Sequence, residues 1–593
     1  MVKATGSTAQ RDPLFEAAVA AGRGTLKSVV IFSMFVNLLM LTGPFFMLQV
    51  YDRVLTSHSV PTLVALSVLV AVLYGFMAAL DIVRGRILAR AAVRLDDTLA
   101  PRMIDAMLIN SADKVPNVGS VPARDLETVR QFVSGPALIA LLDTPWVPVY
   151  LVVIFLFHPV LGYFALGGAV LLFILMLVNE RLTRKPMARL IAQSGTSHNM
   201  TEELYRNAEL IRALGMSGTM RQRWMEQHDK TLVDGMRLTD RNGAATSVTK
   251  SIRLALQSAV LAVGAYLVIQ QEIQAGVMIT ASIIFARALA PVEQSITQWR
   301  NVIAAQKAWI RLKALFSNTN FPANPLELPA PQGYITADNV TLLVRGRDAP
   351  LLQGVNFNIA PGEALGVLGP TGAGKSTLAK VLIGALAPQK GRIQMDGAAL
   401  DQWDRDRLGK HVGFLTQDSE LFAGSVAENI ARFDDDARAG DVIEAAKMSE
   451  LHDYILDLPQ GYDTQLGPDG IPVSGGQRQR IGLARAIYKR PVIVILDEPN
   501  ANLDATGEAA VINCIKRLKT QGSAVIVIAH RPSAIQAVDK ILYLRDGMQL
   551  AFGPRDEVLK KILASSPPAQ TIPAMAEPNT PANDETVQRK SNV

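Results

Sequence analysis

Residues 364–377 read "ALGVLGPTGAGKST", and this stretch decides the fold of the second half of the chain. It begins as an apolar run typical of a buried strand, continues as a glycine-rich turn and ends where a helix can start. In the spacing G-x-x-x-x-G-K-[ST], glycines let backbone N–H groups close around phosphate, the lysine neutralises its charge and the serine hydroxyl can ligate Mg²⁺. The stretch predicts a phosphate-binding loop made of Gly369, Pro370, Thr371, Gly372, Ala373, Gly374, Lys375, Ser376 and Thr377.

A second acidic element supports this prediction. Residues 492–500, "VIVILDEPN", indicate a buried strand that ends at Asp497 and Glu498. We expect Asp497 to hold Mg²⁺ and Glu498 to polarise an attacking water beside the terminal phosphate. His530 also follows an apolar run, in "VIVIAHRPS". A lone histidine there is usually structural, but beside a phosphate loop and an Asp-Glu pair a contact with the γ-phosphate is favoured.

Strand-like and helix-like runs alternate around these motifs, which predicts an α/β domain on a largely parallel sheet over residues 334–564. A Pro- and Asn-rich stretch, residues 316–333, indicates a linker before it. Residues 565–593 are Pro-rich and weakly apolar, so we expect a disordered tail.

The first half of the chain is far more apolar. A membrane span needs about 20 mostly apolar residues, and six segments qualify: 28–50, 62–83, 135–157, 161–180, 251–270 and 275–294. Within the third, Pro145 should loosen the helix. Asp143 is costly there unless it meets a partner or water. It marks either a kink packed within the bundle or, less favoured, a polar point on a substrate path.

Basic residues fix the expected orientation. The connections between spans 1 and 2, 3 and 4, and 5 and 6 are short and poor in Lys and Arg, whereas residues 181–250 are rich in them. Residues 84–134 are equally basic, with Arg84, Arg86, Arg90, Arg94, Arg102, Lys114, Arg124 and Arg130. Since positive loops stay inside, residues 1–27 form a cytoplasmic N-terminal segment. Residues 28–315 form a transmembrane domain whose two long cytoplasmic loops are helical and turn near residues 112 and 213–218.

A second phosphate-holding motif follows about a hundred residues after the first. Residues 473–477, "VSGGQ", precede an apparent helix. A helix N-terminus presents backbone N–H groups and a positive dipole end to an anion. We therefore expect Ser474, Gly475, Gly476 and Gln477 to bind nucleotide as well.

The motifs together resemble the ATP-binding cassette family over about residues 28–562. "GPTGAGKST" looks like its Walker A motif, "VSGGQ" its signature, "VIVILDE" its Walker B motif and His530 its switch histidine. Gln417, in "GFLTQDSELF", looks like the Q-loop glutamine, and "NANLD", which ends at Asp504, looks like the D-loop. The resemblance implies ATP and Mg²⁺ as cofactors. It assigns catalysis to Glu498, His530 and Gln417, metal binding to Ser376, Gln417 and Asp497, and nucleotide binding to Asp504 in addition to the loop and signature residues.

The resemblance also explains the two phosphate motifs. In the family, two cassettes face each other, and each signature covers the nucleotide held by the other chain. The implied architecture is a six-helix, all-α transmembrane domain of the exporter type, followed by an α/β P-loop nucleotide-binding domain. One cassette and six spans imply a pair of chains. A homodimer is favoured because the site looks complete, and a hetero-pair stays open.

Three stretches look like the ATPases of type I protein secretion systems, in the protease- and lipase-exporting subgroup: "DEPNANLD", "ALLDTPWVPVY" and "SIRLALQSAVLAVGAYLVIQ". This implies export of unfolded or partly folded protein across the inner membrane, with a periplasmic membrane fusion protein and an outer-membrane channel as partners. Fewer than about 30 residues precede the first span, and the sole cysteine is Cys514. We therefore expect neither an N-terminal peptidase domain nor an internal disulfide.

Departures and alternatives remain. No aromatic residue stands near Val344 and Arg345 to stack on adenine, the acidic residue before the signature is displaced to Asp469, and Val473 replaces the usual leucine. A homodimeric exporter of a small molecule, peptide or lipid would have the same fold. A soluble ATPase acting on nucleic acid conflicts with six spans, and no aromatic-interleaved basic patch is present. A gated channel without turnover would not need Glu498.

Overall fold

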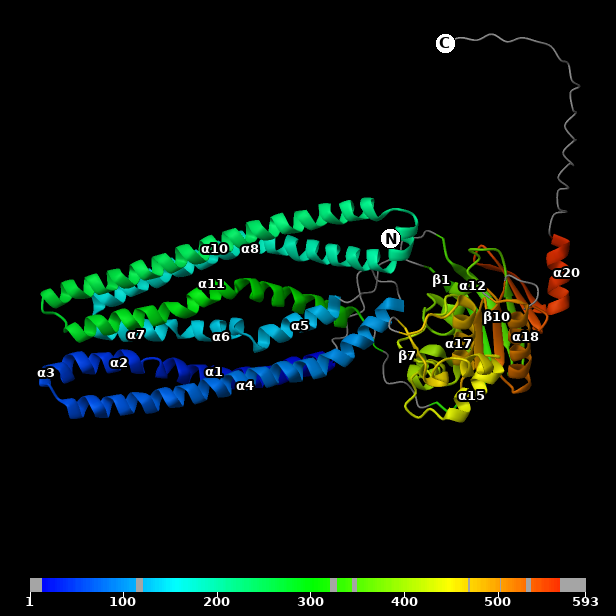
Figure 1. Cartoon of the computed structure of the whole chain (residues 1–593), viewed down its shortest axis with the longest axis horizontal. Helices are drawn as coiled ribbons and strands as arrows, with labels where there is room; N and C mark the ends of the chain where they lie inside the picture. The colour runs from blue at the N-terminus through cyan, green and yellow to red at the C-terminus, as the bar shows by residue number, and fades with distance from the viewer. Residues whose placement is uncertain are drawn as a thin grey trace, which may run out of the picture. The chain divides into compact units, whose positions relative to one another are not determined.

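The computed structural model describes residues 13–112, 121–319, 321, 328–343, 349–467, 470–501, 503–529 and 535–565. The chain divides into two compact units, residues 1–321 and 322–593, which are described separately below. Figure 1 shows the first unit as a bundle of long helices and the second as a sheet with helices on both faces.

The first unit is all-helical in its described part and contains the six predicted spans. Among the described residues, six helical segments are long and apolar enough to cross a membrane. The elements are α1 (Pro13–Leu39), α2 (Thr42–Gln49), the π-helix η1 (Val50–Val54), α3 (Leu55–Ser57), α4 (Val60–Ala112), α5 (Val121–Ser134), α6 (Pro136–Asp143), the 3₁₀ turn η2 (Thr144–Trp146), α7 (Val147–Phe157), α8 (Pro159–Arg206), α9 (Ala208–Ala213), α10 (Ser217–Ile269) and α11 (Ala275–Asn318).

The spans continue as helices far beyond a bilayer, as the sequence predicted. Helices α4 and α10 have 53 residues each, or about 80 Å at 1.5 Å per residue, against a hydrocarbon core of about 30 Å. The turn predicted at 213–218 lies between α9 and α10, with Gly215 in the left-handed region. Helix α4 ends at Ala112, and residues 113–120 lie outside the described part. Helix α11 runs through Asn318, so the predicted linker is helical at its start.

The helix of the third span breaks near Pro145, as the sequence predicted. Helix α6 ends at Asp143, the 3₁₀ turn η2 contains Pro145, and α7 resumes at Val147. The Thr144 hydroxyl donates to the Ala140 carbonyl at 2.8 Å, which occupies a carbonyl at the end of the broken helix.

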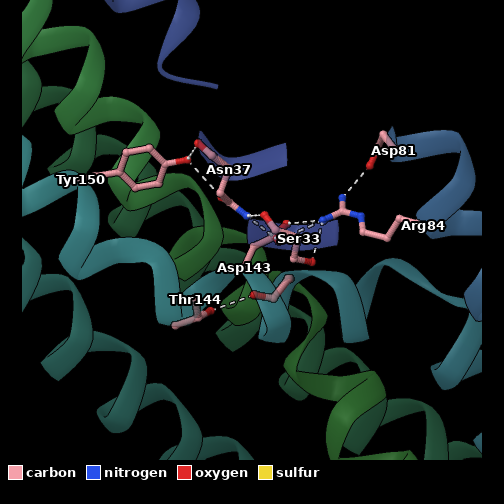
Figure 2. A network of polar contacts seen from close by, with 8 residues as sticks. Ser33, Asn37, Asp81, Arg84, Asp143, Thr144 and Tyr150 are labelled. Atoms are coloured by element: carbon pink, nitrogen blue, oxygen red, sulfur yellow. Dashed lines mark hydrogen bonds and ion pairs between the residues drawn. The ribbon is translucent and has the colours of Figure 1, made fainter. Parts of the chain in front are cut away.

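Asp143 lies in a buried polar network that joins three spans (Figure 2). Its Oδ1 accepts from Arg84 Nη1 on α4 at 3.0 Å and from Asn37 Nδ2 on α1 at 2.8 Å. Arg84 also donates to the Ser33 hydroxyl at 3.1 Å, and the Tyr150 hydroxyl donates to the Asn37 carbonyl at 2.8 Å. All five side chains belong to buried residues. The aspartate therefore has the partners that a carboxylate within a span requires.

This network corrects one assignment made from the sequence. The sequence places Arg84 with the basic cytoplasmic loop, but this residue is only 4% exposed and faces the bundle interior. Its charge neutralises Asp143, which is 7% exposed. Of the two alternatives for Asp143, the described residues support a kink packed within the bundle.

The second unit contains a ten-stranded sheet among its described residues, in the order β5-β4-β1-β2-β12-β11-β3-β10-β9-β6. Strands β11, β3, β10, β9 and β6 are parallel, as expected, whereas β5, β4, β1 and β2 pair antiparallel. The strands are β1 (Ile335–Leu342), β2 (Leu352–Ile359), β3 (Ala364–Leu368), β4 (Lys390–Met395), β5 (Ala398–Ala399), β6 (Val412–Leu415), β9 (Ile493–Asp497), β10 (Ala524–Ile528), β11 (Lys540–Arg545) and β12 (Met548–Pro554), with β7 (Gly424–Ser425) and β8 (Gln465–Leu466) as a separate pair.

Helices cover both faces of this sheet because its central strands are apolar on both sides. Along β9, Ile493 and Ile495 belong to one core, and Val494 and Leu496 to the other. Cys514, on α18, is fully buried in the second of these cores. The helices are α12 (Lys375–Leu382), α13 (Arg405–Gly409), α14 (Val426–Ile430), α15 (Ala439–Met448), α16 (His452–Leu456), α17 (Gly475–Ile487), α18 (Ala505–Thr520) and α20 (Arg555–Ser565), with 3₁₀ turns η3 (Leu400–Gln402) and η4 (Gly461–Asp463).

Candidate active site

The predicted phosphate loop, residues 369–374, connects β3 to α12. Gly369 has φ of +154°, and a Cβ there would lie 2.1 Å from the Leu544 carbonyl oxygen. Gly374 has φ of +93°, and a Cβ there would lie 2.7 Å from the Leu351 carbonyl oxygen. Both positions therefore require glycine, and the loop packs directly against neighbouring backbone.

The Lys375 side chain lies inside this loop. Its Nζ donates to the carbonyls of Gly369 and Pro370, both at 2.9 Å, and the residue is 5% exposed. Burial lowers the pKa of Lys375, while the nearby carboxylates of Glu498 and Asp497 act in the opposite direction. The ammonium thus lies beneath the turn, where its positive charge can neutralise a bound phosphate. Of the other predicted loop residues, Pro370, Thr371 and Gly372 are exposed, Ala373 is buried and Thr377 belongs to the first turn of α12.

Two predicted metal ligands are brought together from distant parts of the chain. Ser376 Oγ lies 3.3 Å from Asp497 Oδ1 and donates a hydrogen bond to it. Burial raises the pKa of Asp497, the hydrogen bond from Ser376 lowers it, and the Glu498 charge raises it further. A hydroxyl beside a carboxylate is a hard oxygen donor pair of the kind that Mg²⁺ takes, with substrate phosphates and waters completing its shell.

The parallel strands explain why these side chains meet. Strands β3, β10, β9 and β6 are successive neighbours, so their carboxyl ends lie along one edge of the sheet. The phosphate loop follows β3, Asp497 ends β9 and Gln417 follows β6. Gln417 Nε2 donates to Glu498 Oε2 at 3.2 Å. His530 follows β10 in the sequence but lies outside the described residues, as do Val344, Arg345 and Asp469.

The predicted signature stands at the start of helix α17. Ser474 is the N-cap, and its hydroxyl accepts from the Gln477 N–H at 3.2 Å. The Gln477 side chain in turn accepts from the Ser474 N–H at 2.8 Å, forming a capping box. Ser474 and Gly475 are exposed, and Gly476 is half-buried. The serine, the glycines and the positive end of the helix dipole are therefore displayed at the surface of the described cassette.

Asp504 has two partners within its own chain. It caps α18 by accepting from the Gly507 N–H at 2.8 Å, and it pairs with Arg480 of the signature helix at 3.1 Å. Hydrogen bonds from the Gly507 backbone and the Thr506 side chain lower the pKa of Asp504. Asp504 thus joins the signature helix α17 to the N-terminus of α18.

One polar residue near the site was missed by sequence reasoning. Gln479, two positions after the predicted signature, is 2% exposed and donates from Nε2 to the Glu498 carbonyl at 2.9 Å. Its signal in the sequence is weak. The seven-residue stretch "GQRQRIG" is typical of a polar helix start, and only the fold shows that this glutamine points inward.

Comparison with known families identifies the class. Residues 28–292 match the family model described as ABC transporter transmembrane region, and residues 352–501 match the one described as ABC transporter. The chain is 43% identical over 561 residues to the type I secretion system ATP-binding protein PrsD of Rhizobium meliloti (strain 1021), covering 94% of this chain and 96% of PrsD. The protein therefore belongs to the ABC transporter family, and its second unit is the ATPase of a multi-pass membrane protein.

More distant relatives span similar lengths of the chain. The cyclolysin secretion/processing ATP-binding protein CyaB of Bordetella pertussis (strain Tohama I) is 29% identical, over 92% of this chain and 77% of CyaB. The leukotoxin translocation ATP-binding protein LktB of a Pasteurella haemolytica-like species (strain 5943B) is 30% identical, over 92% and 78%. A bacterial Atm1-family ABC exporter solved with ATP bound shares the fold, with a TM-score of 0.77 at 22% identity over 93% of this chain and all of that one.

Proposed function

We propose that the protein is the ATPase and permease of a type I secretion system and exports unfolded or partly folded protein across the inner membrane. The observation that carries this proposal is the likeness to PrsD along almost the whole chain. The relatives CyaB and LktB, whose names refer to toxin secretion and translocation, support the same substrate class.

The geometry of the cassette supports hydrolysis by its own residues. The loop N–H groups and Lys375 hold and neutralise the phosphates of ATP. Glu498 accepts a proton from the attacking water, and Gln417 keeps that carboxylate oriented through their hydrogen bond. Ser376 and Asp497 would hold Mg²⁺, which would supply charge neutralisation at the phosphates. His530 contacts the γ-phosphate in this proposal.

Two copies are needed to complete each site. The surface-displayed N-terminus of α17 covers the nucleotide bound by the second copy, where its dipole stabilises negative charge. Both termini and the ATPase lie in the cytoplasm, because the long basic loops do. A periplasmic membrane fusion protein and an outer-membrane channel receive the exported chain.

The test is a deletion of the gene followed by comparison of the proteins in the medium. We expect specific secreted proteins to disappear and to return with the wild-type gene but not with a Lys375→Ala copy. Affinity purification of the complex should recover a periplasmic adaptor. An unchanged set of secreted proteins, with a small molecule accumulating inside the cells, would contradict protein export and favour the small-molecule alternative.

A further inference from the structure

Gln479 connects the signature helix to the residue proposed as the catalytic base. It is the fifth residue of α17, it is 2% exposed, and its Nε2 donates to the backbone carbonyl of Glu498 at 2.9 Å. A side-chain amide that is buried without hydrogen bonds is costly. The bond to the Glu498 carbonyl supplies a partner that this buried amide needs.

The backbone of Glu498 needs such support. Its φ is +50°, in the left-handed region that is unfavourable for a residue with a side chain. A conformation of this kind persists where surrounding contacts hold it, and it is frequent at active sites. The Glu498 N–H donates to the Ile528 carbonyl at 3.0 Å, and its carbonyl accepts from the Ala501 N–H at 3.2 Å. The Gln479 bond adds a restraint that comes from α17.

Helix α17 is itself fixed to the strands of the site. The half-buried residue Arg432 donates from its guanidinium to the carbonyls of Arg485 and Ala486 near the C-terminal end of α17, at 2.8 and 2.9 Å. It also donates to the Val412 carbonyl, at the start of β6, at 3.0 Å. Because β6 leads to Gln417, hydrogen bonds connect α17 both to the strand before Gln417 and to Glu498 itself.

We propose that Gln479 is a positioning residue for ATP hydrolysis, holding the Glu498 backbone so that its carboxylate faces the nucleotide of its own chain. The inference rests on the catalytic role proposed for Glu498. The exposed N-terminus of the same helix carries Ser474 and Gly475, which serve the nucleotide of the second copy.

The experiment uses the full-length protein reconstituted in lipid. Gln479→Met keeps the length and volume of the side chain but removes the donor. We expect kcat for ATP to fall about 10- to 100-fold, as for a misplaced catalytic group, while KM and nucleotide affinity stay within about twofold. The control Ile481→Met changes another fully buried side chain of α17 that cannot hydrogen-bond to Glu498. We expect it to keep wild-type kcat.

A double-variant cycle separates positioning from folding. In a Glu498→Gln background, measured by single turnover, adding Gln479→Met should lower the residual rate less than about twofold, because both changes act on one group. A further tenfold loss there, or unchanged kcat in Gln479→Met alone, overturns the inference. If Glu498→Gln itself hydrolyses ATP normally, the proposed role of Glu498 fails instead. Should Gln479→Met not assemble, Gln479→Asn withdraws the amide by one carbon and should give the same split between kcat and KM.

Discussion

Gln417 Nε2 lies 3.2 Å from Glu498 Oε2, so a glutamine after β6 and a glutamate after β9 are hydrogen-bonded across neighbouring strands. The two residues are 81 positions apart in the sequence. The carboxylate is therefore oriented by a side chain of the protein. This arrangement is what a general base requires, since geometry must be set before proton transfer.

Replacing Glu498 with Gln should stop turnover while keeping nucleotide bound. The amide fills the same space, but it cannot accept a proton from water, so kcat should fall about 100-fold or more. Steady-state ATPase assays and binding of a fluorescent nucleotide measure the two effects separately. Glu557→Gln, an exposed change on α20, is the matched control. Normal hydrolysis by Glu498→Gln would show that another group takes the proton.

Lys375→Ala should act on binding rather than on chemistry alone. Its ammonium lies beneath the phosphate loop, bonded to the carbonyls of Gly369 and Pro370. Without that charge the phosphates lose a charge-assisted contact of about 1.5–3 kcal/mol, which corresponds to an affinity about 10- to 100-fold lower. Isothermal titration with ATP in the presence of Mg²⁺ measures the change. Lys390→Ala, at the exposed start of β4, should bind normally. Wild-type affinity in Lys375→Ala would refute the assignment.

Gly369→Ala should disrupt the loop because the new methyl group meets backbone. It would lie 2.1 Å from the Leu544 carbonyl oxygen, at a φ that already disfavours a side chain. We expect loss of ATP binding together with a lower unfolding temperature of the cassette. Gly440→Ala is the control, since nothing lies within 4 Å of a Cβ there. An unaltered unfolding temperature and affinity in Gly369→Ala would mean that the loop adopts another conformation.

Breaking the Arg84–Asp143 pair should destabilise the bundle more than removing it altogether. The single change Arg84→Met leaves the buried Asp143 carboxylate uncompensated and should cost about 3–5 kcal/mol. Asp143→Asn should cost less, because Arg84 still pairs with Asp81. The double variant Arg84→Met/Asp143→Leu should recover most of that loss. Thermal unfolding of the detergent-solubilised protein measures the series.

Asp81→Asn is the control for this series. Asp81 also pairs with Arg84, at 2.7 Å, but its side chain is 56% exposed. We therefore expect an effect below about 1 kcal/mol. A double variant that is no more stable than the single variants would contradict this expectation. It would show that the buried pair stabilises the bundle by more than the neutralisation of two charges.

Local spacing in the sequence was enough to predict the spans and the motifs. Glycines at 369 and 374, a lysine and a serine define the phosphate loop, and apolar runs of bilayer length define the six spans. The long helical extensions of the spans followed from their periodic apolar residues. These features depend on residues that are close together in the sequence, so they can be predicted without knowledge of the fold.

Contacts between distant segments could not be predicted in the same way. Arg84 stands at the end of an apolar run, where a basic residue normally marks the cytoplasmic side, and only the packing of α4 against α6 shows its partner. Gln479 lies in a run of polar residues whose inward side depends on how α17 meets the sheet. The antiparallel half of the sheet was likewise missed, because strand direction depends on connections rather than on composition.

The burial of Cys514 has a practical consequence for following this transporter at work. Burial raises the pKa of its thiol to about 12, so at neutral pH the sulfur is both protonated and out of reach of solvent. Maleimide dyes and spin labels should therefore not react with the native protein. A cysteine introduced at any exposed position then becomes the unique attachment point for a probe. Cys514 need not be replaced before distances between two copies are measured.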